Sequence, residues 1–357
     1  MKKISIIFAF FILSLQMTAQ NEHQIPGKET LEKNPSVFVD KTDRNNNFYD
    51  NEETYSLPMP RLIIEGEIEN PGPVDFSKFI KRTVIVKETR LNKDGSNSFI
   101  GAYRYDGYSL FDILNDRILN KKNAEEFRPI IDLYVEIEND KGEKVILSWG
   151  EIYYPNFLHN CILATDVMRI VPSKTRDLWP LPADNKLVIA SDLLTERNIS
   201  HPIKITVKSY DKTFPVNREI SPLYSKEIKL FSGNHLSETY TYIPNSFPLV
   251  TLHTIFYGKG RGIHTTQPFT GIPLKEFLVK TILFTTANLK NGLIAIVGLD
   301  GYRSVYTVSE IMNRNDQAEV LLVPCPDEKD GGMFRIFPSC DFFSDRAVKA
   351  VSEIHFN

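Results

Sequence analysis

The stretch best suited to chemistry is Gly258-Lys259-Gly260-Arg261-Gly262-Ile263-His264. Glycines let backbone N–H groups approach a ligand closely, and the side chains of Lys259, Arg261 and His264 add positive charge. This combination suits a phosphate or a carboxylate, because arginine offers two parallel donors and histidine gains charge below about pH 6.5. The competing interpretation is a flexible hairpin connection with solvated charges.

Two further residues complete the candidate ligand-binding set. Arg104 ends the first-half counterpart, Gly101-Ala102-Tyr103-Arg104, which has fewer glycines and one cation. Tyr302 follows Asp300-Gly301 in a turn between two expected strands. The set predicts a bound small anion, with the weaker site in the first half. If Arg261 supplies a charge-assisted hydrogen bond, Arg261→Ala should weaken anion binding roughly 10- to 100-fold.

No catalytic residue and no metal ligand is predicted. His159-Asn160-Cys161 is the one local cluster that suggests a metal or a nucleophile. No Cys or His stands near it at a zinc-like spacing, and no base partner is evident.

These residues belong to a chain that contains one block twice. Three pairs of segments match in the same order: 105–110 with 269–274, 150–152 with 309–311, and 192–199 with 341–348. In the last pair Arg197 aligns with Arg346. A repeated salt bridge and an anion site both explain these two arginines.

The repeat predicts two domains of an α+β fold, at 58–210 and 222–357. Short strands alternate with only one or two helices per copy, which favours α+β over a doubly wound sheet. Helices are expected at 110–118 and 274–282, where apolar residues share one face, and Ser109 with Asp112 resembles a capping box. Strands are expected at 61–66, 83–86, 133–137, 144–147, 203–207, 228–233, 249–252, 293–297, 304–308 and 351–356.

The N-terminus predicts export. Lys2 and Lys3 precede an apolar run from Ile4 to Leu15, and Thr18-Ala19-Gln20 offers a cleavage site, so residues 1–20 are read as a general-route signal peptide. Residues 21–57 are polar and read as a flexible leader. The mature protein is expected outside the cytoplasm, in the periplasm or secreted, with no integral membrane segment after cleavage.

The overall charge and the cysteines exclude several classes. A formal net charge of −3 gives no footprint for nucleic acid. The three cysteines, Cys161, Cys325 and Cys340, form no disulfide framework.

The ordered motifs resemble the molybdopterin-binding domain of the sulfite oxidase family, present here as two tandem copies over 58–357. The resemblance rests on Gly66 with Asn70-Pro71, on Phe269-Thr270-Gly271-Ile272-Pro273-Leu274, on Asp300-Gly301-Tyr302 and on Arg346-Ala347-Val348-Lys349. It implies a pterin-held molybdenum with one cysteine thiolate. In the family that cysteine lies between the early strands and the aromatic-Gly helix start. The corresponding stretches, 90–104 and 256–268, contain no cysteine.

The resemblance therefore predicts a family fold without the family's metal centre, that is, a pseudoenzyme with no cofactor. The resemblance also implies twin-arginine export of folded holoprotein, whereas this signal is of the general type. The favoured hypothesis is an exported, non-catalytic protein that binds a small anion or an envelope protein. The alternatives are a periplasmic molybdopterin-dependent oxidoreductase with non-cysteine ligation, and a structural interaction protein of the cell envelope.

Overall fold

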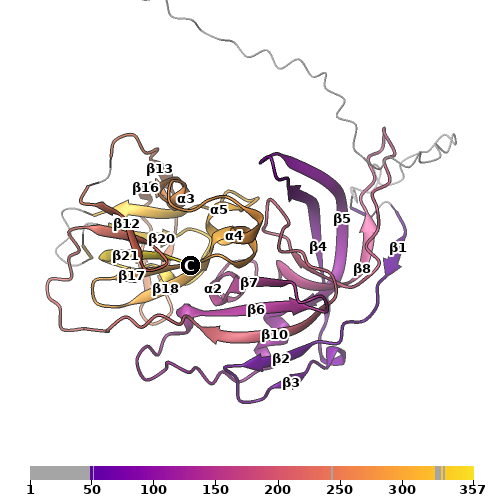
Figure 1. Cartoon of the computed structure of the whole chain (residues 1–357), viewed down its shortest axis with the longest axis horizontal. Coiled ribbons are helices and arrows are strands. Elements are labelled where there is room, and N and C mark those ends of the chain that lie inside the picture. The colour runs from indigo at the N-terminus through magenta and orange to yellow at the C-terminus, as the bar shows by residue number, and fades with distance from the viewer. Residues whose placement is uncertain (1–48, 51, 243, 326–330, 333) are drawn as a thin grey trace, which may run out of the picture. The chain divides into compact units, whose positions relative to one another are not determined.

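The computed structural model describes residues 49–357 except 51, 243, 326–330 and 333 (Figure 1). All described residues belong to one compact unit. Strands take up 42% of the structure and helices 12%, and four small sheets are arranged like the blades of a four-bladed β-propeller. The prediction of an α+β, sulfite-oxidase-like fold is therefore wrong, because the fold is mostly β. The predicted signal peptide and residues 21–48 of the predicted leader lie outside the described residues.

The first half supplies two sheets. Sheet 1 has the order β1-β8-β5-β4, with β9 also paired to β8, and sheet 2 has the order β3-β2-β10-β6-β7. Their strands are β1 Thr54–Ser56, β2 Ile63–Gly66, β3 Gly72–Pro73, β4 Lys81–Leu91, β5 Asn97–Ser109, β6 Leu133–Asn139, β7 Lys144–Ser148, β8 Cys161–Arg169, β9 Lys186–Ile189 and β10 Pro202–Ser209.

The second half supplies two more. Sheet 3 has the order β12-β11-β21-β17-β18 and sheet 4 the order β13-β16-β19-β20, while β14 and β15 form a separate two-stranded hairpin. The strands are β11 Ile228–Ser232, β12 His235–Tyr240, β13 Val250–Leu252, β14 Phe256–Gly258, β15 Gly262–Thr265, β16 Phe269–Pro273, β17 Leu293–Gly298, β18 Arg303–Thr307, β19 Val320–Pro324, β20 Phe334–Pro338 and β21 Val351–Phe356.

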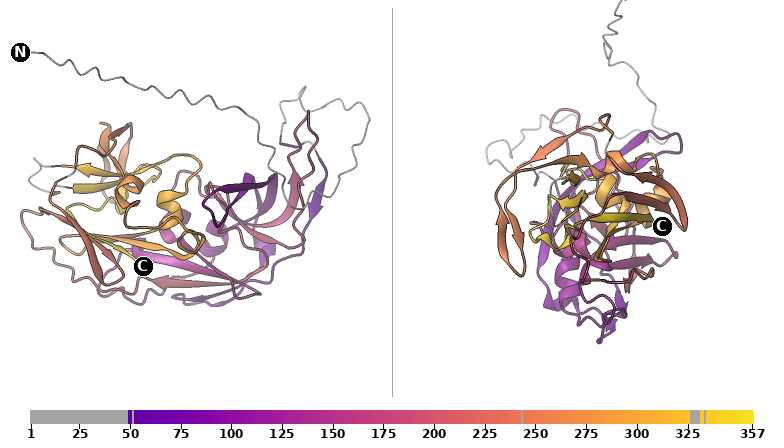
Figure 2. Two further views of the ribbon diagram at one scale, coloured as in Figure 1. Left: turned by 45° about the horizontal axis from the view of Figure 1, so that its top comes forward. Right: turned by 90° about the vertical axis from the view of Figure 1, so that its left-hand side faces the viewer.

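The two halves share one strand order. Sheets 2 and 3 each contain one parallel pairing, β2 with β10 and β11 with β21, flanked by antiparallel pairings. In sheet 1 the order β4-β5-β8-β9 corresponds to β13-β16-β19-β20 of sheet 4. Figure 1 and the left view of Figure 2 show sheets 1 and 4 on opposite sides of the described body.

Two equivalent glycines illustrate this correspondence. Gly107 of β5 and Gly271 of β16 both lie where a strand crosses close to its neighbour. A Cβ atom would stand 2.0 Å from the Leu163 carbonyl oxygen at Gly107, and 2.6 Å from the Leu322 carbonyl oxygen at Gly271. The glycine of the repeated aromatic-x-Gly motif is therefore required by close backbone packing.

The helices are short, which is the main reason that the α+β prediction failed. They are α1 Leu110–Asn115, α2 Trp149–Tyr153, α3 Leu274–Leu278, α4 Thr286–Asn291 and α5 Val308–Met312, with 3₁₀ turns η2 Phe76–Lys78, η3 Ile130–Asp132 and η4 Ser344–Arg346. The helix expected to reach Ile118 ends at Asn115, because the Ile118 backbone N–H bonds the Asn70 side chain at 2.8 Å. Ile118 is exposed rather than part of a buried helix face.

Several strands replace segments predicted as helix start or leader. Residues 105–109, expected to lead into a helix, are the end of the long strand β5. Thr54–Ser56, counted with the leader, form β1 and pair with β8. Ser109 does stand at the N-terminus of α1, but its side chain makes no capping hydrogen bond, so the predicted capping box with Asp112 is absent there.

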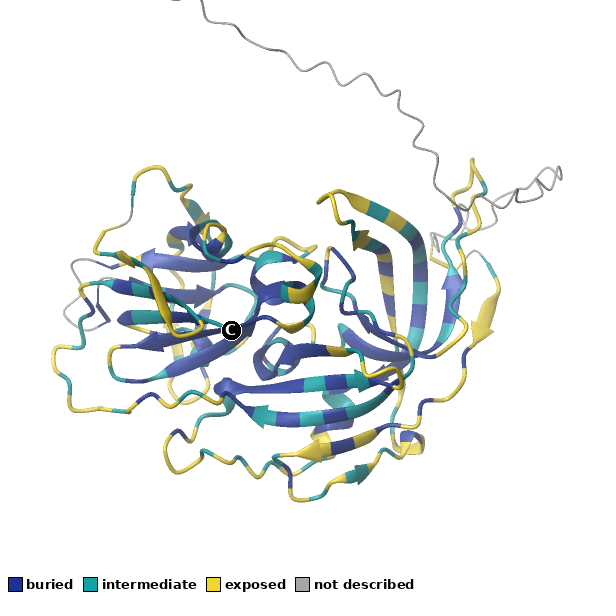
Figure 3. Cartoon of the chain, viewed as in Figure 1, coloured by how far each residue is buried: buried dark blue, intermediate teal, exposed yellow. Residues whose placement is uncertain are grey.

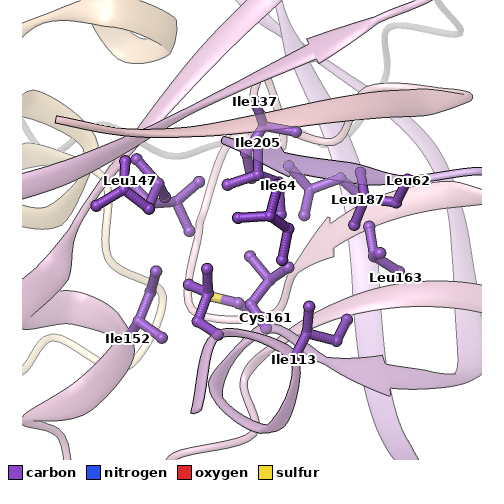
Figure 4. Close-up of a cluster of buried hydrophobic side chains, with 14 of the residues drawn as sticks. Leu62, Ile64, Ile113, Ile137, Leu147, Ile152, Cys161, Leu163, Leu187 and Ile205 are labelled. Carbon is purple, nitrogen blue, oxygen red and sulfur yellow. The ribbon is translucent and has the colours of Figure 1, made fainter. Parts of the chain in front are cut away.

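Separate apolar cores hold the sheets together. The largest first-half core lies between sheets 1 and 2, where Leu62, Ile64, Ile137, Leu163 and Ile205 interdigitate (Figure 4). The largest second-half core lies between sheets 3 and 4. A third cluster contains Tyr134 and Ile146 of sheet 2 with Ala295 and Val305 of sheet 3, so it joins the two halves. Figure 3 shows the alternation of buried and exposed residues along β4 and β5, whose outer face is uncovered.

Candidate functional site

A buried ion cluster at the boundary between the halves fixes the loops around the candidate site. Ser148 and Thr307 are the N-caps of α2 and α5, and both helices begin with a capping box, completed by Glu151 and Glu310. The glutamate of the repeated Glu-Ile motif is thus the third residue of a capped helix. In addition, Glu151 binds Arg197 and Glu310 binds Arg346, so each glutamate pairs with the repeated arginine of its own half.

The two arginines are fully buried and bind carboxylates in the same way. Arg197 forms two bonds to Asp192, at 2.7 and 2.9 Å, and two to Glu151, both at 2.9 Å. Arg346 forms two bonds to Asp341, at 2.6 and 2.7 Å, and one to Glu310 at 2.5 Å. Of the two interpretations of these arginines, the structure shows the repeated salt bridge.

At this cluster, side-chain hydroxyl groups form hydrogen bonds between the two halves of the chain. Ser148 Oγ donates to Glu310 Oε2 at 2.7 Å, and Thr307 Oγ1 donates to Glu151 Oε1 at 3.3 Å. The flanking backbone is also reciprocal, since Phe342 N–H bonds the Tyr154 carbonyl at 2.7 Å and Leu193 N–H bonds the Asn313 carbonyl at 2.7 Å. The 341–346 loop is therefore held by both halves.

The cluster carries more acid than base. Four buried carboxylates, Asp192, Glu151, Glu310 and Asp341, face two buried guanidinium groups. Burial raises the pKa of Glu151 to about 7, against the lowering effect of Arg197 and with a further rise from Glu310. Burial also raises the pKa of Asp192 and of Asp341. Such groups are closed into ion pairs that maintain the structure.

The glycine-rich stretch forms the β14–β15 hairpin, which packs beside sheet 4. Phe256 anchors it, with its ring 5.2 Å from that of Phe269 and 5.9 Å from that of Phe337. Two of the three glycines serve the hairpin itself. Gly262 has φ of +72°, and a Cβ at Gly258 would stand 2.4 Å from His264 Nε2.

One face of this hairpin exposes apolar side chains. Tyr257 and Ile263 are a directly opposed cross-strand pair, and Phe342 contacts Tyr257 at a ring distance of 5.8 Å. Tyr257 is 40%, Ile263 60% and Phe342 53% exposed. Phe343 supports them from beneath and packs against the buried Phe127–Tyr154 cluster. We call Tyr257, Ile263 and Phe342 the aromatic face.

The equivalent place in the first half is closed by hydrogen bonds. Val84 and Leu252 are equivalent, because they pair with the aligned residues Tyr105 and Phe269. Counting the same number of residues forward from each makes Thr89 the equivalent of Tyr257. Thr89 Oγ1 donates to the Leu193 carbonyl at 2.6 Å, and the Thr195 hydroxyl donates to the Thr89 carbonyl at 2.8 Å. Polar contacts of the first half are thus replaced by partly exposed rings in the second.

The predicted ligand-binding residues do not gather around one point. Lys259 and Arg261 lie in the exposed loop of the hairpin, whereas the His264 ring lies against Phe256 and Gly258, on the side away from Tyr257. Within the described residues none of these three side chains has a hydrogen bond or an ion pair. The loop therefore offers two cations beside the aromatic face.

The other two predicted residues have structural partners. Tyr302 donates its hydroxyl to the Asp345 carbonyl at 2.6 Å, and burial raises its pKa. Arg104 lies on sheet 1, where it pairs with Asp50 at 2.8 Å and Asp106 at 3.2 Å. Neither side chain reaches the β14–β15 loop as a free donor.

The His159 cluster also lacks the geometry of a catalytic relay. His159 Nδ1 lies 3.1 Å from Ser109 Oγ and 3.8 Å from Asp112 Oδ2. A serine relay needs the hydroxyl and the carboxylate on opposite ring nitrogens, and here both face the same one. Cys161 points instead into the first-half core (Figure 4).

A pterin-held molybdenum requires a thiolate ligand that faces the cofactor. Cys161 is packed in the core and Cys325 is buried against the aromatic cluster of sheet 4. Cys340 Sγ lies 3.6 Å from Asp341 Oδ1 at the ion cluster, and burial raises its pKa to about 12. These positions do not fit a thiolate that faces a bound cofactor. In the described residues no group of three His, Cys, Asp or Glu side chains is placed to hold a metal.

The local sequence pattern does not predict the aromatic face, because Phe342 lies far along the chain from Tyr257 and Ile263. The signal was present in the alignment of the halves, where Phe342-Phe343 replaces Leu193-Leu194. At that loop Phe342 adds an exposed ring beside Tyr257.

No family model matches the chain, and no curated protein matches it. Among the described residues, no helix has the length and the apolar character that a membrane span requires.

Proposed function

We propose that this chain is an exported, non-catalytic binding protein that recognises its partner through the aromatic face of the β14–β15 hairpin. The observation that carries the proposal is the exposed cluster of Tyr257, Ile263 and Phe342. In the first half, the equivalent position is instead occupied by hydrogen bonds between Thr89 and its neighbours. Adjacent exposed aromatic and aliphatic side chains are characteristic of interaction surfaces.

The ion cluster supports this proposal because it holds the surface in place. Phe342 follows Asp341, whose carboxylate binds the buried Arg346 through two bonds. A rigid loop loses little conformational entropy when a partner docks, so its apolar contacts contribute more fully to affinity. Export is proposed from the signal-like residues 1–20, which would place the surface outside the cytoplasm.

Site-specific photocrosslinking in the native envelope tests the proposal. A photoreactive benzoyl-phenylalanine at Ile263 should give one discrete adduct. The matched control is the same residue at Ile85 of β4, an isoleucine that is also exposed, at 44%. Ile85 belongs to the first half, so no adduct is expected there. Failure to form an adduct at Ile263, or the same adducts from both positions, would contradict the proposal.

A further inference from the structure

The aromatic face has a charged border. Lys259 and Arg261 lie in the loop that joins β14 and β15, directly beyond the paired Tyr257 and Ile263. In the part of the chain that the structure describes, neither cation pairs with a carboxylate. Arg104 of the first half, by contrast, is neutralised by two aspartates. The positive charges of Lys259 and Arg261 are therefore available to a partner outside the chain.

From this arrangement we infer that the partner is an acidic polypeptide segment that carries aromatic or aliphatic side chains. The inference rests on the proposed function, since it names the partner of the same surface. Apolar partner side chains would cover Tyr257, Ile263 and Phe342, and carboxylates would meet Lys259 and Arg261. Burial of such side chains against a partner is favourable because it removes apolar surface from water.

The geometry does not favour a small anion. His264 lies on the other side of the hairpin from Tyr257, so the three cations do not converge on one point. Exposed charge pairs are weak because solvent screens them, so two of them do not hold a lone phosphate or carboxylate. The same cations suffice as a border around an apolar contact, where they set the rate of association and the choice of partner.

The rings also argue for a polypeptide over an anionic polysaccharide. Tyr257 is tilted by 56° to Phe342 and by 38° to Phe343, and Phe342 is at 86° to Phe343. Tilted rings beside an aliphatic Ile263 do not form a single flat face on which a sugar ring can stack. The exposed edges of these rings can instead be covered by apolar side chains of a polypeptide.

Binding of defined polymers to the purified full-length chain tests the inference. The probes are a fluorescent random copolymer of glutamate and tyrosine, polyglutamate of the same length, and polygalacturonate. The copolymer should bind at least about tenfold more tightly than either of the others, which corresponds to about 1.4 kcal/mol.

Two double variants separate charge from apolar contact. Lys259→Glu with Arg261→Glu should weaken copolymer binding about tenfold and remove its sensitivity to salt. Tyr257→Ala with Phe342→Ala should reduce copolymer binding to the level of polyglutamate. Lys87→Glu with Arg90→Glu, on the exposed positions of β4, is the matched charge control and should leave binding unchanged.

The outcomes distinguish the two proposals. Tighter binding of polygalacturonate, or copolymer binding that is insensitive to the Lys259/Arg261 reversal, overturns the acidic-polypeptide inference. If the Ile263 crosslink still forms in that case, the aromatic face remains a binding surface with a different partner. If the crosslink fails as well, the proposed function fails with it.

Discussion

The β4–β5 arm of the first half and the β13–β16 region of the second begin from the same strand order and end differently. In the first half the two strands stay paired from Lys81–Tyr108 out to Leu91–Asn97. In the second half the pairing stops at Leu252–Phe269, and the intervening segment makes the β14–β15 hairpin. One copy thus uses this region for structure, while the other exposes an aromatic face. The proposed binding surface therefore lies where the second half differs from the first.

The two halves have equivalent arginine–carboxylate pairs at their shared ion cluster. Arg197→Met and Arg346→Met should therefore each lower the free energy of unfolding by about 3–5 kcal/mol, because each leaves buried carboxylates without their cation. Chemical denaturation measures this, with Arg90→Met at an exposed position as the control. A loss below about 1 kcal/mol at either arginine would show that the halves are not equivalent there.

The excess of acid in the cluster predicts a pH effect on stability. The pKa of Glu151 rises from 4.5 to about 7 on folding, so the folded protein keeps a proton that the unfolded chain loses between these values. Stability contributed by that proton is present at low pH and is lost as the pH rises to 7. Relative to Glu151→Gln, the wild type should therefore lose stability as the pH rises through that window.

Denaturation of both proteins at pH 5 and pH 8 measures this difference. Glu65→Gln is the control, because its carboxylate is half exposed and lies outside the cluster. The account predicts that Glu65→Gln keeps the wild-type pH profile. A wild type that gains stability over Glu151→Gln as the pH rises would reverse the sign and contradict the excess of buried acid.

The equivalent glycines sharpen the comparison at the strands. Gly107→Ala and Gly271→Ala should each cost about 1–3 kcal/mol, because the added methyl group meets a backbone carbonyl. Gly107 should cost more, since its contact is closer. Gly260→Ala, where a Cβ meets nothing within 4 Å, should be neutral to within about 0.5 kcal/mol. Thermal unfolding ranks the three, and a neutral Gly107→Ala would remove the packing explanation of the motif.

The smallest stability effects contrast the closed region with the open one. Thr89→Val removes the hydroxyl that binds the Leu193 carbonyl and should cost about 1 kcal/mol. Ile263→Ala, on the exposed aromatic face, should change stability by less than about 0.5 kcal/mol. If Ile263→Ala proved the more costly of the two in urea denaturation, the hairpin would be a structural element.

The sequence revealed the matching segments, several strands and the paired arginines, because these follow from local pattern and alignment. It did not reveal that Ser148 bonds Glu310 across the halves, since no local signal encodes a contact between residues so far apart. The α+β prediction failed because apolar spacing at 110–118 resembles a helix, whereas the Asn70 side chain takes the Ile118 N–H. At the candidate site the sequence predicts Lys259 and Arg261 as ligand-binding residues, and their role stays a prediction. The neighbouring rings could not be predicted, because the fold brings Phe342 to Tyr257.

Thiol labelling at the two hairpin tips tests the central claim most directly. Gly260→Cys at the β14–β15 tip and Lys93→Cys at the β4–β5 tip would be compared in a Cys340→Ser background, where serine is the residue that the first half has at the aligned position, Ser191. A maleimide should label both cysteines rapidly in the purified protein. In the native envelope the account predicts that Gly260→Cys is labelled at least about tenfold more slowly, while Lys93→Cys is unchanged. Equal labelling of Gly260→Cys in the two settings would contradict a partner at the aromatic face.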